Sequence, residues 1–430
     1  MAAIGEDLLA QQREVEAQAR DFGLEVPEIS YELVDHSELN EIAAYGGFPV
    51  RYAHWRFGME YDRLIKGHSY GLQRIYELVI NTRPVVAYLL KQNAPVEQKL
   101  VMAHVCGHAD FFEHNAWFAH TDGNMMDVMA SHAARVRTLS DEVGHDPVED
   151  FIDRALSLDN LVDASALLRG RDTPGNAPPL GDEIASGDIL GHLLQEAPLE
   201  EWERELLGFL RDEAYYFLPQ MLTKVMNEGW ASFWHSRLMT GTLLRDAEVV
   251  DYAVQHAGAM GGDEGPMNPY KLGLELFLHE LEKGGGVRGG GLQRVFDMRA
   301  IHNDLTFIDN ALDEDFCRAH GMGATTEECE AARESLLASL TNGGQPVIRR
   351  VAGEGPDLEL EHVWSGSELQ MEQAEETLRN LQCMWRGPVR LHSRLENRKV
   401  LMTCLESGVT REYGEVLDET AEKSAGHPSA

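Results

Sequence analysis

Basic residues, cysteines and long apolar runs are all scarce in this sequence. Its 430 residues contain 37 Lys and Arg against 72 Asp and Glu, a formal net charge of −35. A surface this acidic repels nucleic acid and anionic membranes, so neither is expected as a partner. The five cysteines are scattered and form no CxxC pair, which argues against a disulfide framework and a cysteine-based zinc site. No apolar run is long enough to span a bilayer.

The N-terminal residues and the ratio of arginine to lysine indicate the compartment and the source of the protein. Residues 1–20 are acidic and amphipathic and have neither the basic start nor the apolar stretch of a signal peptide, so we expect a cytoplasmic protein. Arginine far outnumbers lysine among the few cations. Acidic, lysine-poor surfaces suit a salt-rich cytoplasm, where ions screen the self-repulsion. We therefore attribute the charge to a halophilic source and not to function.

The spacing of apolar residues predicts a mainly α-helical chain. Helical patterns cover residues 5–22, 60–78, 96–119, 123–138, 147–157, 199–217, 221–242 and 292–318, with a break expected at Pro219. Residues 84–91 are expected to form a short buried strand or helix. Residues 170–185, rich in Gly, Pro and Asp, are expected to form an exposed loop, and the glycine-rich run 283–291 a flexible linker.

The texture of the sequence changes after Gly343-Gly344. Residues 346–352, 357–364, 387–394 and 397–405 alternate as strands, and 369–385 is an amphipathic helix between them. This ββαββ pattern predicts a small α+β domain over 343–415, after a helical core domain over 1–342. Residues 416–430 are polar and are predicted to be a disordered tail.

The most informative feature is the pair His104 and His108. Two histidines four apart on a helix project from one face and can share a single metal ion. Six of the 18 histidines (104, 108, 114, 120, 132 and 145) fall within one tenth of the chain, more than a random scatter gives. Cys106 lies between the pair, should point away from their shared face and is expected to pack in the core. Taken alone, the pair can equally be two satisfied core histidines.

Glu228 strengthens the interpretation as a metal site. It lies about 120 residues after the pair in a second apolar helical segment, flanked by Trp230, Phe233 and Trp234. A carboxylate buried there needs a cation, a hydrogen-bonding partner or a raised pKa. The alternative is a buried salt bridge to an arginine. A glutamate as third ligand leaves the fourth position open for water or substrate. We therefore predict a divalent metal, first of all zinc, bound by His104, His108 and Glu228.

Three further residues are candidates for proton transfer. His235, two helical turns after Glu228, can be a fourth ligand, a general acid or a donor to a bound oxyanion. In the HExxH pattern of zinc hydrolases, the glutamate after the first histidine activates water, and here that position is Val105. Asp110 and Glu213 are the candidate replacement bases, and both can instead hold a histidine tautomer. Without a base, the metal would act as a Lewis acid or be structural.

The same segments resemble the SpoVR family (stage V sporulation protein R), and the resemblance covers nearly the whole chain. The blocks that carry it, in order, are HWRFGMEYDRL (54–64), YGLQRIYELVIN (70–81), QKLVMAHVCGHADFFEHN (98–115), MMDVMASHA (125–133), EAYYFLPQMLTKVMNEGWASFWH (213–235), NPYKLGLELF (268–277) and RAIHNDLTFID (299–309). A separate similarity is to gluzincin peptidases, some of which place their third zinc ligand in an EGWA-type helix. Only His104, His108 and Glu228 carry over from that group, and Val105 departs from its pattern.

The SpoVR resemblance implies a pathway and partners but no defined reaction. It implies a role in sporulation or stress response, alongside a PrkA-type serine protein kinase and a von Willebrand-type domain protein. Two hypotheses remain. One is a metal-dependent hydrolase of peptide or amide bonds with a zincin-like core. The other is a non-catalytic regulatory scaffold that joins the kinase and its partner, in which the His/Glu cluster serves stability.

Overall fold

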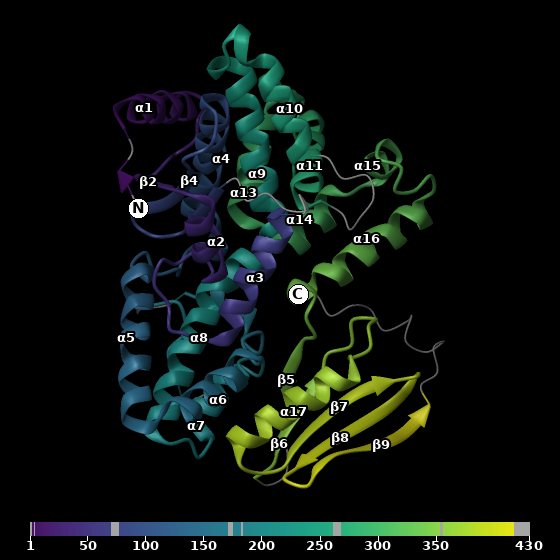
Figure 1. Ribbon diagram of the computed structural model, residues 1–430. Helices are drawn as coiled ribbons and strands as arrows, with labels where there is room; N and C mark the ends of the chain where they lie inside the picture. Colours follow the sequence, from purple (N-terminus) through teal and green to yellow (C-terminus); the bar gives the residue numbers. More distant parts are fainter. Residues whose placement is uncertain are drawn as a thin grey trace. The chain divides into compact units, whose positions relative to one another are not determined.

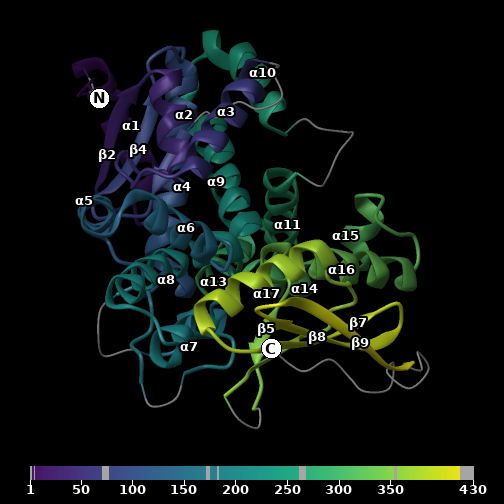
Figure 2. The same ribbon diagram turned by 60° about the horizontal axis from the view of Figure 1, so that its bottom comes forward.

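The computed structural model describes residues 2–3, 5–69, 77–170, 175–181, 184–260, 268–352 and 356–416. Over these residues the chain forms 17 α-helices and two β-sheets (Figures 1 and 2). The mainly helical character predicted from the sequence is confirmed. No helix in these ranges is both long and apolar enough to cross a bilayer.

The chain divides into two compact units. The first comprises Met1–Thr138, Leu167–Gly175 and Pro219–Leu337, and the second Leu139–Ala166, Asn176–Leu218 and Ala338–Ala430. Two segments that precede residue 219 therefore group with the C-terminal part. The predicted division into domains 1–342 and 343–415 is a statement about which segments fold independently. The division into compact units does not test independent folding, so the domain boundaries stay a prediction.

The first unit contains a four-stranded mixed sheet. Its strand order is β1 (Ala2–Ala3), β2 (Ile29–Val34), β4 (Val85–Leu90) and β3 (Glu77–Ile80). The two central strands, β2 and β4, are parallel, and each outer strand is antiparallel to its neighbour. All six residues of β4 are buried. Of the two forms predicted for 84–91, the strand is therefore the one that occurs, whereas no strand was predicted over residues 29–34.

Helices make up the rest of the first unit. They are α1 (Glu6–Asp21), α2 (His36–Ala44), α3 (Trp55–Ser69), α4 (Pro95–His114), α5 (Met125–Val143), α9 (Lys224–Leu238), α10 (Val249–Met260), α11 (Pro269–Lys283), α12 (Gly286–Gly289), α13 (Gly291–Ile301), α14 (Asp304–Ala311), α15 (Glu314–Ala319) and α16 (Thr326–Leu340). The last residues of α5 and α16 belong to the second unit. Helix α9 packs between α4 and α11, and Figure 1 shows α4, α9 and α11 side by side. These three helices position the candidate site.

The predicted helix break at Pro219 is wrong. Helix α8 (Glu201–Leu222) continues through Pro219, and the helical conformation is interrupted only at Thr223, directly before α9 begins. A proline removes one backbone hydrogen bond, which a long helix with other contacts can tolerate. The Thr223 hydroxyl donates a hydrogen bond of 2.7 Å to the Pro219 carbonyl, so the end of the helix is satisfied by a side chain.

The glycine run 283–291 is a tight turn and not the flexible linker that was predicted. It forms the short helix α12 between α11 and α13, bounded by Gly285 (φ 86°) and Gly290 (φ 100°) in the left-handed region. A methyl group on Gly284 would lie 2.4 Å from the Cα of Gly291. The glycines therefore serve a close approach of two backbones, a role that composition alone does not distinguish from flexibility.

The second unit is built around a five-stranded mixed sheet. Its strand order is β5 (Ile348–Arg350), β6 (Leu358–His362), β7 (Val389–Leu395), β8 (Arg398–Leu405) and β9 (Gly408–Val416). The parallel pair β6 and β7 is connected by α17 (Met371–Trp385), which packs on the sheet (Figures 1 and 2). The unit also contains α6 (His145–Leu156), α7 (Ile189–Glu196) and most of α8. The predicted ββαββ order is confirmed and extended by β9. Residues 417–430, predicted as a disordered tail, lie outside the described residues.

The cysteines follow the prediction only in part. Cys317 in α15 and Cys329 in α16 form a disulfide, which the scattered positions did not indicate. Cys106, Cys383 and Cys404 are free thiols. Cys106 is fully buried, as predicted, and burial, followed by the nearby Glu16 carboxylate, raises the pKa of its thiol.

Candidate metal centre

Helix α4 positions His104 and His108 in the core of the first unit. Pro95 begins the helix, where its missing N–H is not needed, and the helix ends at His114. His104 and His108 are 3% and 5% exposed, and their rings lie edge to face at a centroid distance of 4.6 Å. The predicted shared face of the two histidines is therefore confirmed.

Small residues bring α9 close to both of its neighbours. A methyl group on Gly107 of α4 would lie 2.7 Å from the Cα of Ala231, and one on Gly229 would lie 2.4 Å from the Cα of Gly273 in α11. These approaches, on two sides of α9, need residues without a side chain. They position Glu228 opposite the histidine pair.

The three predicted ligands converge on one point. Glu228 Oε2 lies 3.6 Å from the Nε2 atoms of both His104 and His108. Ligand atoms on a tetrahedral metal with bonds of about 2.05 Å lie about 3.3 Å apart, so the spacing needs only a small adjustment. The Glu228 side chain is 19% exposed, but its Oε2 atom is buried and accepts no hydrogen bond from the described residues. A buried acceptor without a donor fits a metal ligand. His104, His108 and Glu228 can therefore hold a metal ion.

The opposite nitrogens of both rings are engaged. His108 Nδ1 lies 2.9 Å from Asn227 Oδ1, and His104 Nδ1 lies 2.8 Å from His235 Nδ1. Because the amide oxygen only accepts, His108 Nδ1 carries the proton and its Nε2 has a free lone pair. The same tautomer of His104 would donate to His235. Such partners behind metal-bound histidines fix the orientation of the rings and raise their basicity.

His235 therefore lies on the side of the His104 ring that faces away from Glu228, and only 2% of the residue is exposed. This contact does not correspond directly to any of the three roles predicted for His235, namely fourth ligand, general acid and donor to an oxyanion. It corresponds instead to the role of a residue that orients a metal ligand. Asn227 has the same relation to His108. Its position beside Glu228 was the signal for a contact near the site, but only the helix packing shows which histidine it meets.

Electrostatics keep the cluster in the protonation states that metal binding requires. Burial, aided by the adjacent His104, lowers the pKa of His108 to about 4, although Glu228 and Asn227 oppose this shift. Burial raises the pKa of Glu228, His104, His108 and Lys224 lower it, and the net shift is downward. At neutral pH His108 is therefore neutral and Glu228 is ionised, as ligands must be.

Asp110 is placed among structural partners. Its carboxylate accepts hydrogen bonds from the Trp230 indole at 2.9 Å and the Glu25 backbone N–H at 3.0 Å, and lies 3.6 Å from the Arg299 guanidinium. The side chain is fully buried, and burial raises its pKa although these partners oppose the shift. Asp110 thus joins α4 to α9 and α13. Its predicted role as a base receives no support from these contacts.

The other predicted residues lie in varied surroundings. Glu213 is buried in the α8 segment of the second unit, and its predicted role stays a prediction. Val105 is fully buried. His114 bonds the Asp110 carbonyl through Nδ1 at 2.8 Å, and His120 bonds the Arg169 carbonyl through Nε2 at 2.9 Å, so both serve local structure.

Asp304 was missed by the sequence patterns. Its two carboxylate oxygens accept hydrogen bonds from the backbone N–H groups of Val225 and Met226, at 2.9 and 2.8 Å, although these residues lie 79 and 78 positions earlier in the sequence. These residues belong to the first turn of α9, whose own N-cap residue, Thr223, makes no capping hydrogen bond with its side chain. Asp304 therefore caps the helix that carries Glu228.

Comparisons with known proteins identify the family of the chain. A family model described as SpoVR like protein matches residues 4–177 and 182–339, which include all three ligand candidates. A similar curated protein, "Uncharacterized protein YcgB" of Escherichia coli (strain K12), is 29% identical over 319 residues, 61% of each chain. The chain thus spans about three fifths of the length of that relative. No solved structure matches the chain.

Proposed function

The chain belongs to the SpoVR-like protein family, and from this premise and the site geometry we propose that it is a metalloprotein with a zincin-like centre that hydrolyses peptide or amide bonds. The metal is divalent, with zinc as the first candidate. The observation that carries the proposal is the convergence of His104 Nε2, His108 Nε2 and Glu228 Oε2, at 3.6 Å from the carboxylate oxygen to each ring. Two histidines and one glutamate are a ligand set of catalytic zinc sites.

The residues around the site support metal binding by preparing the ligands. Asn227 and His235 hold the imidazoles from behind, so that both rings direct Nε2 toward Glu228. The pKa of Glu228 is shifted downward on balance, so this side chain is ionised at neutral pH and can act as a ligand. A bound divalent metal supplies Lewis acidity, which polarises a carbonyl and lowers the pKa of water.

Hydrolysis also needs proton transfer, and we propose that His235 takes part in it indirectly, through the ring of His104 that it orients. His235 meets His104 through Nδ1, so a proton between the two rings can shift when the charge at the site changes. Asp110 already has the Trp230 indole and the Glu25 N–H as donors. We therefore propose His235, and not Asp110, as the residue that responds to charge at the site. Glu213 stays the candidate for a separate base.

The second candidate is a regulatory scaffold that acts with a PrkA-type kinase and a von Willebrand-type domain protein. Burial favours it: both histidine ligands are 5% exposed or less, and Glu228 has 19% of its side chain exposed. A metal so enclosed can serve stability, because a structural site needs no access for substrate. In this case the metal would hold α4 against α9.

The first experiment is metal analysis of untagged protein by mass spectrometry, with His104→Ala and Glu228→Ala as test variants. About one metal per chain in the wild type, lost in both variants, is expected. His145→Ala is the matched control, because His145 lies in the other unit with 69% of its side chain exposed. A well-folded wild type without metal would end the metalloprotein proposal.

A second experiment separates the two candidates. Metal-loaded wild type is incubated with an unfolded protein substrate, and new amino termini are counted. Hydrolysis that disappears in Glu228→Ala supports the enzyme. Metal content without hydrolysis, together with partner capture by both wild type and Glu228→Ala, supports the scaffold.

A further inference from the structure

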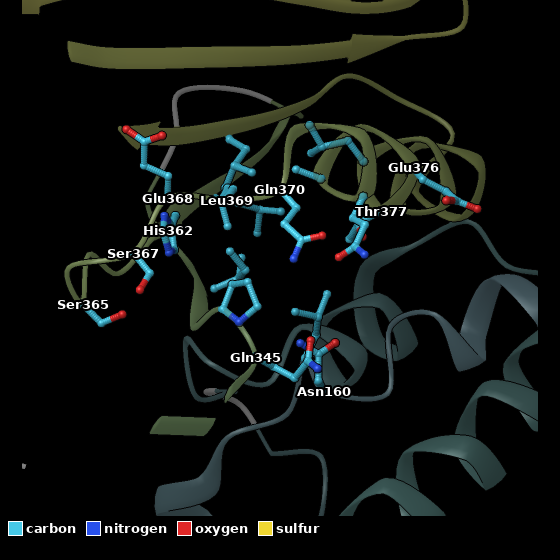
Figure 3. A pocket seen from close by; sticks show the side chains of 18 of the residues that line it. Asn160, Gln345, His362, Ser365, Ser367, Glu368, Leu369, Gln370, Glu376 and Thr377 are labelled. Atoms are coloured by element: carbon cyan, nitrogen blue, oxygen red, sulfur yellow. The ribbon is translucent and has the colours of Figure 1, made fainter. Parts of the chain in front are cut away.

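The second unit contains a pocket far larger than a packing defect. Its volume is about 640 Å³, within the range of small-ligand sites. Residues from 157–161, 338–348, 360–370 and 373–381 line it, together with Leu391 of β7. All of these segments belong to the same unit. Figure 3 shows the pocket between the first turns of α17 and the chain around Gln345.

The charge of the lining excludes anionic ligands. The described lining residues include no Lys or Arg, and their carboxylates, Glu368 and Glu376, lie at opposite edges in Figure 3. Burial, followed by the nearby Arg394, lowers the pKa of His362, so this ring is neutral at neutral pH. A phosphate or carboxylate would meet no countercharge there. The part of the ligand that enters the pocket is therefore not an anion.

Side-chain amides supply the polar contacts. Gln370 projects into the pocket toward Gln345 and Asn160, which approach from the other side (Figure 3). None of these three side-chain amides hydrogen-bonds another residue in the described part of the chain; Gln345 and Gln370 are exposed and Asn160 is half-buried, so all three are accessible to a ligand. Each amide can donate and accept at once. A peptide group presents the complementary pair, one N–H and one C=O.

The apolar part of the lining is aliphatic. Leu360, Leu378 and Leu381 are each 1% exposed, and Leu391 is 4% exposed, so they form a rigid base. The described lining contains no Phe, Tyr or Trp. Sugar rings and nucleobases are bound by stacking on aromatic faces, which this pocket does not offer. An aliphatic side chain fits such a base through shape and burial alone.

We propose that this pocket binds an uncharged peptide segment, with an aliphatic side chain against the leucines and its flanking peptide groups on Asn160, Gln345 and Gln370. The site is separate from the metal centre and lies in the other compact unit. It gives the protein a peptide-recognition function that does not depend on the proposed hydrolysis.

The test is calorimetric titration of the full chain with acetyl-Gly-Leu-Gly-amide. Saturable binding is expected, and acetyl-Gly-Asp-Gly-amide is expected to bind at least tenfold more weakly, because its carboxylate meets no cation. N-acetylglucosamine is the saccharide probe and is expected not to bind. Equal affinity for the Asp peptide, tighter binding of the saccharide, or no peptide binding up to the solubility limit would each overturn the proposal.

Variants locate the binding. Gln370→Ala and Asn160→Ala are each expected to weaken the Leu peptide about two- to tenfold, the range for one hydrogen bond. Gln195→Ala is the matched control, since Gln195 is exposed on α7 of the same unit and outside the pocket. His104→Ala should bind the peptide as the wild type does, which distinguishes this site from the metal centre. Unchanged binding in the Gln370→Ala, Asn160→Ala double variant would place the peptide elsewhere and refute the assignment.

Discussion

Gly229→Ala tests whether backbone contact between α9 and α11 determines the geometry of the metal centre. The new methyl group would lie 2.4 Å from both the Cα and the carbonyl carbon of Gly273. Non-bonded carbons normally approach to about 3.5 Å, so the two helices must separate by about 1 Å. No side chain can rotate to relieve the contact, because both atoms belong to the backbone.

Two opposing effects give the expected magnitude. Overpacking a core costs about 1–3 kcal/mol, and a contact to rigid backbone belongs at the upper end of that range. Replacing glycine by alanine in a helix raises the free energy of unfolding by about 1 kcal/mol, because alanine has the higher helix propensity. We therefore expect Gly229→Ala to lower the free energy of unfolding by about 2 kcal/mol. Gly208→Ala is the matched control, since Gly208 lies in α8 with nothing within 4 Å of the added methyl, and it should gain about 1 kcal/mol.

The assay is urea denaturation of metal-free protein, followed by the fluorescence of the buried Trp230 and Trp234. Metal content is measured on the same preparations. Ligand distances in metal sites hold within about 0.2 Å, so a shift of α9 should also weaken metal binding, whereas Gly208→Ala should leave it intact. If Gly229→Ala is as stable as Gly208→Ala, the reasoning from helix contact is refuted.

Three further predictions concern the ligands and the cysteines. His235→Ala and Asn227→Ala should each reduce metal affinity about 10–100-fold by competition with a chelating dye, whereas Asn227→Asp, which keeps an acceptor, should retain the metal. The pKa of His108 is about 4 in the folded protein against an ordinary 6.5, so the unfolded chain takes up this proton first as the pH falls. The stability that it contributes is complete above pH 6.5 and is lost as the pH falls to about 4, by about 3 kcal/mol in metal-free protein. Thermal unfolding at several pH values measures this loss of stability, and His108→Gln should make the stability depend less on pH. An unchanged pH dependence in this variant would contradict the assignment of the loss to His108. Alkylation and mass spectrometry of unreduced, denatured protein should leave Cys317 and Cys329 unmodified, and Cys329→Ser should cost about 3 kcal/mol because it opens a short loop; full alkylation would disprove the bond.

The group of two histidines and one glutamate could be predicted because its signal is local. His104 and His108 share a helix face through their spacing alone, and Glu228 is costly to bury without a partner. The helices that carry them have strong apolar patterns, so α4 and α9 were predicted within a few residues, although α4 ends five residues earlier than expected. The ββαββ order likewise follows from alternation within each segment.

Features that depend on the approach of distant segments could not be predicted. Strand β2 pairs with β4, more than 50 residues later, and its own six residues give only a weak alternating pattern. The run that contains Gly284 was predicted to be a flexible linker, and no interpretation of Gly107 and Gly229 followed from the sequence. The structure uses all three glycines for close backbone contact. The partner of His235 depends on how α9 faces α4, since its position two turns after Glu228 allows several contacts.

Metal binding and hydrolysis depend on different side chains, so one can hold without the other. Metal binding would require His104, His108 and Glu228, and it is supported by their convergence and by the pKa shifts of His108 and Glu228. Hydrolysis requires a base in addition, and the position that carries it in HExxH enzymes is the buried Val105. The nearest predicted substitute, Asp110, is committed to the Trp230 indole and the Glu25 N–H. A chemical role for the metal would therefore need one of two things. The metal could act through its own Lewis acidity, with His235 in contact with the ligand His104, or a base could come from outside this cluster. If neither operates, the same three residues would form a structural centre that joins α4 to α9.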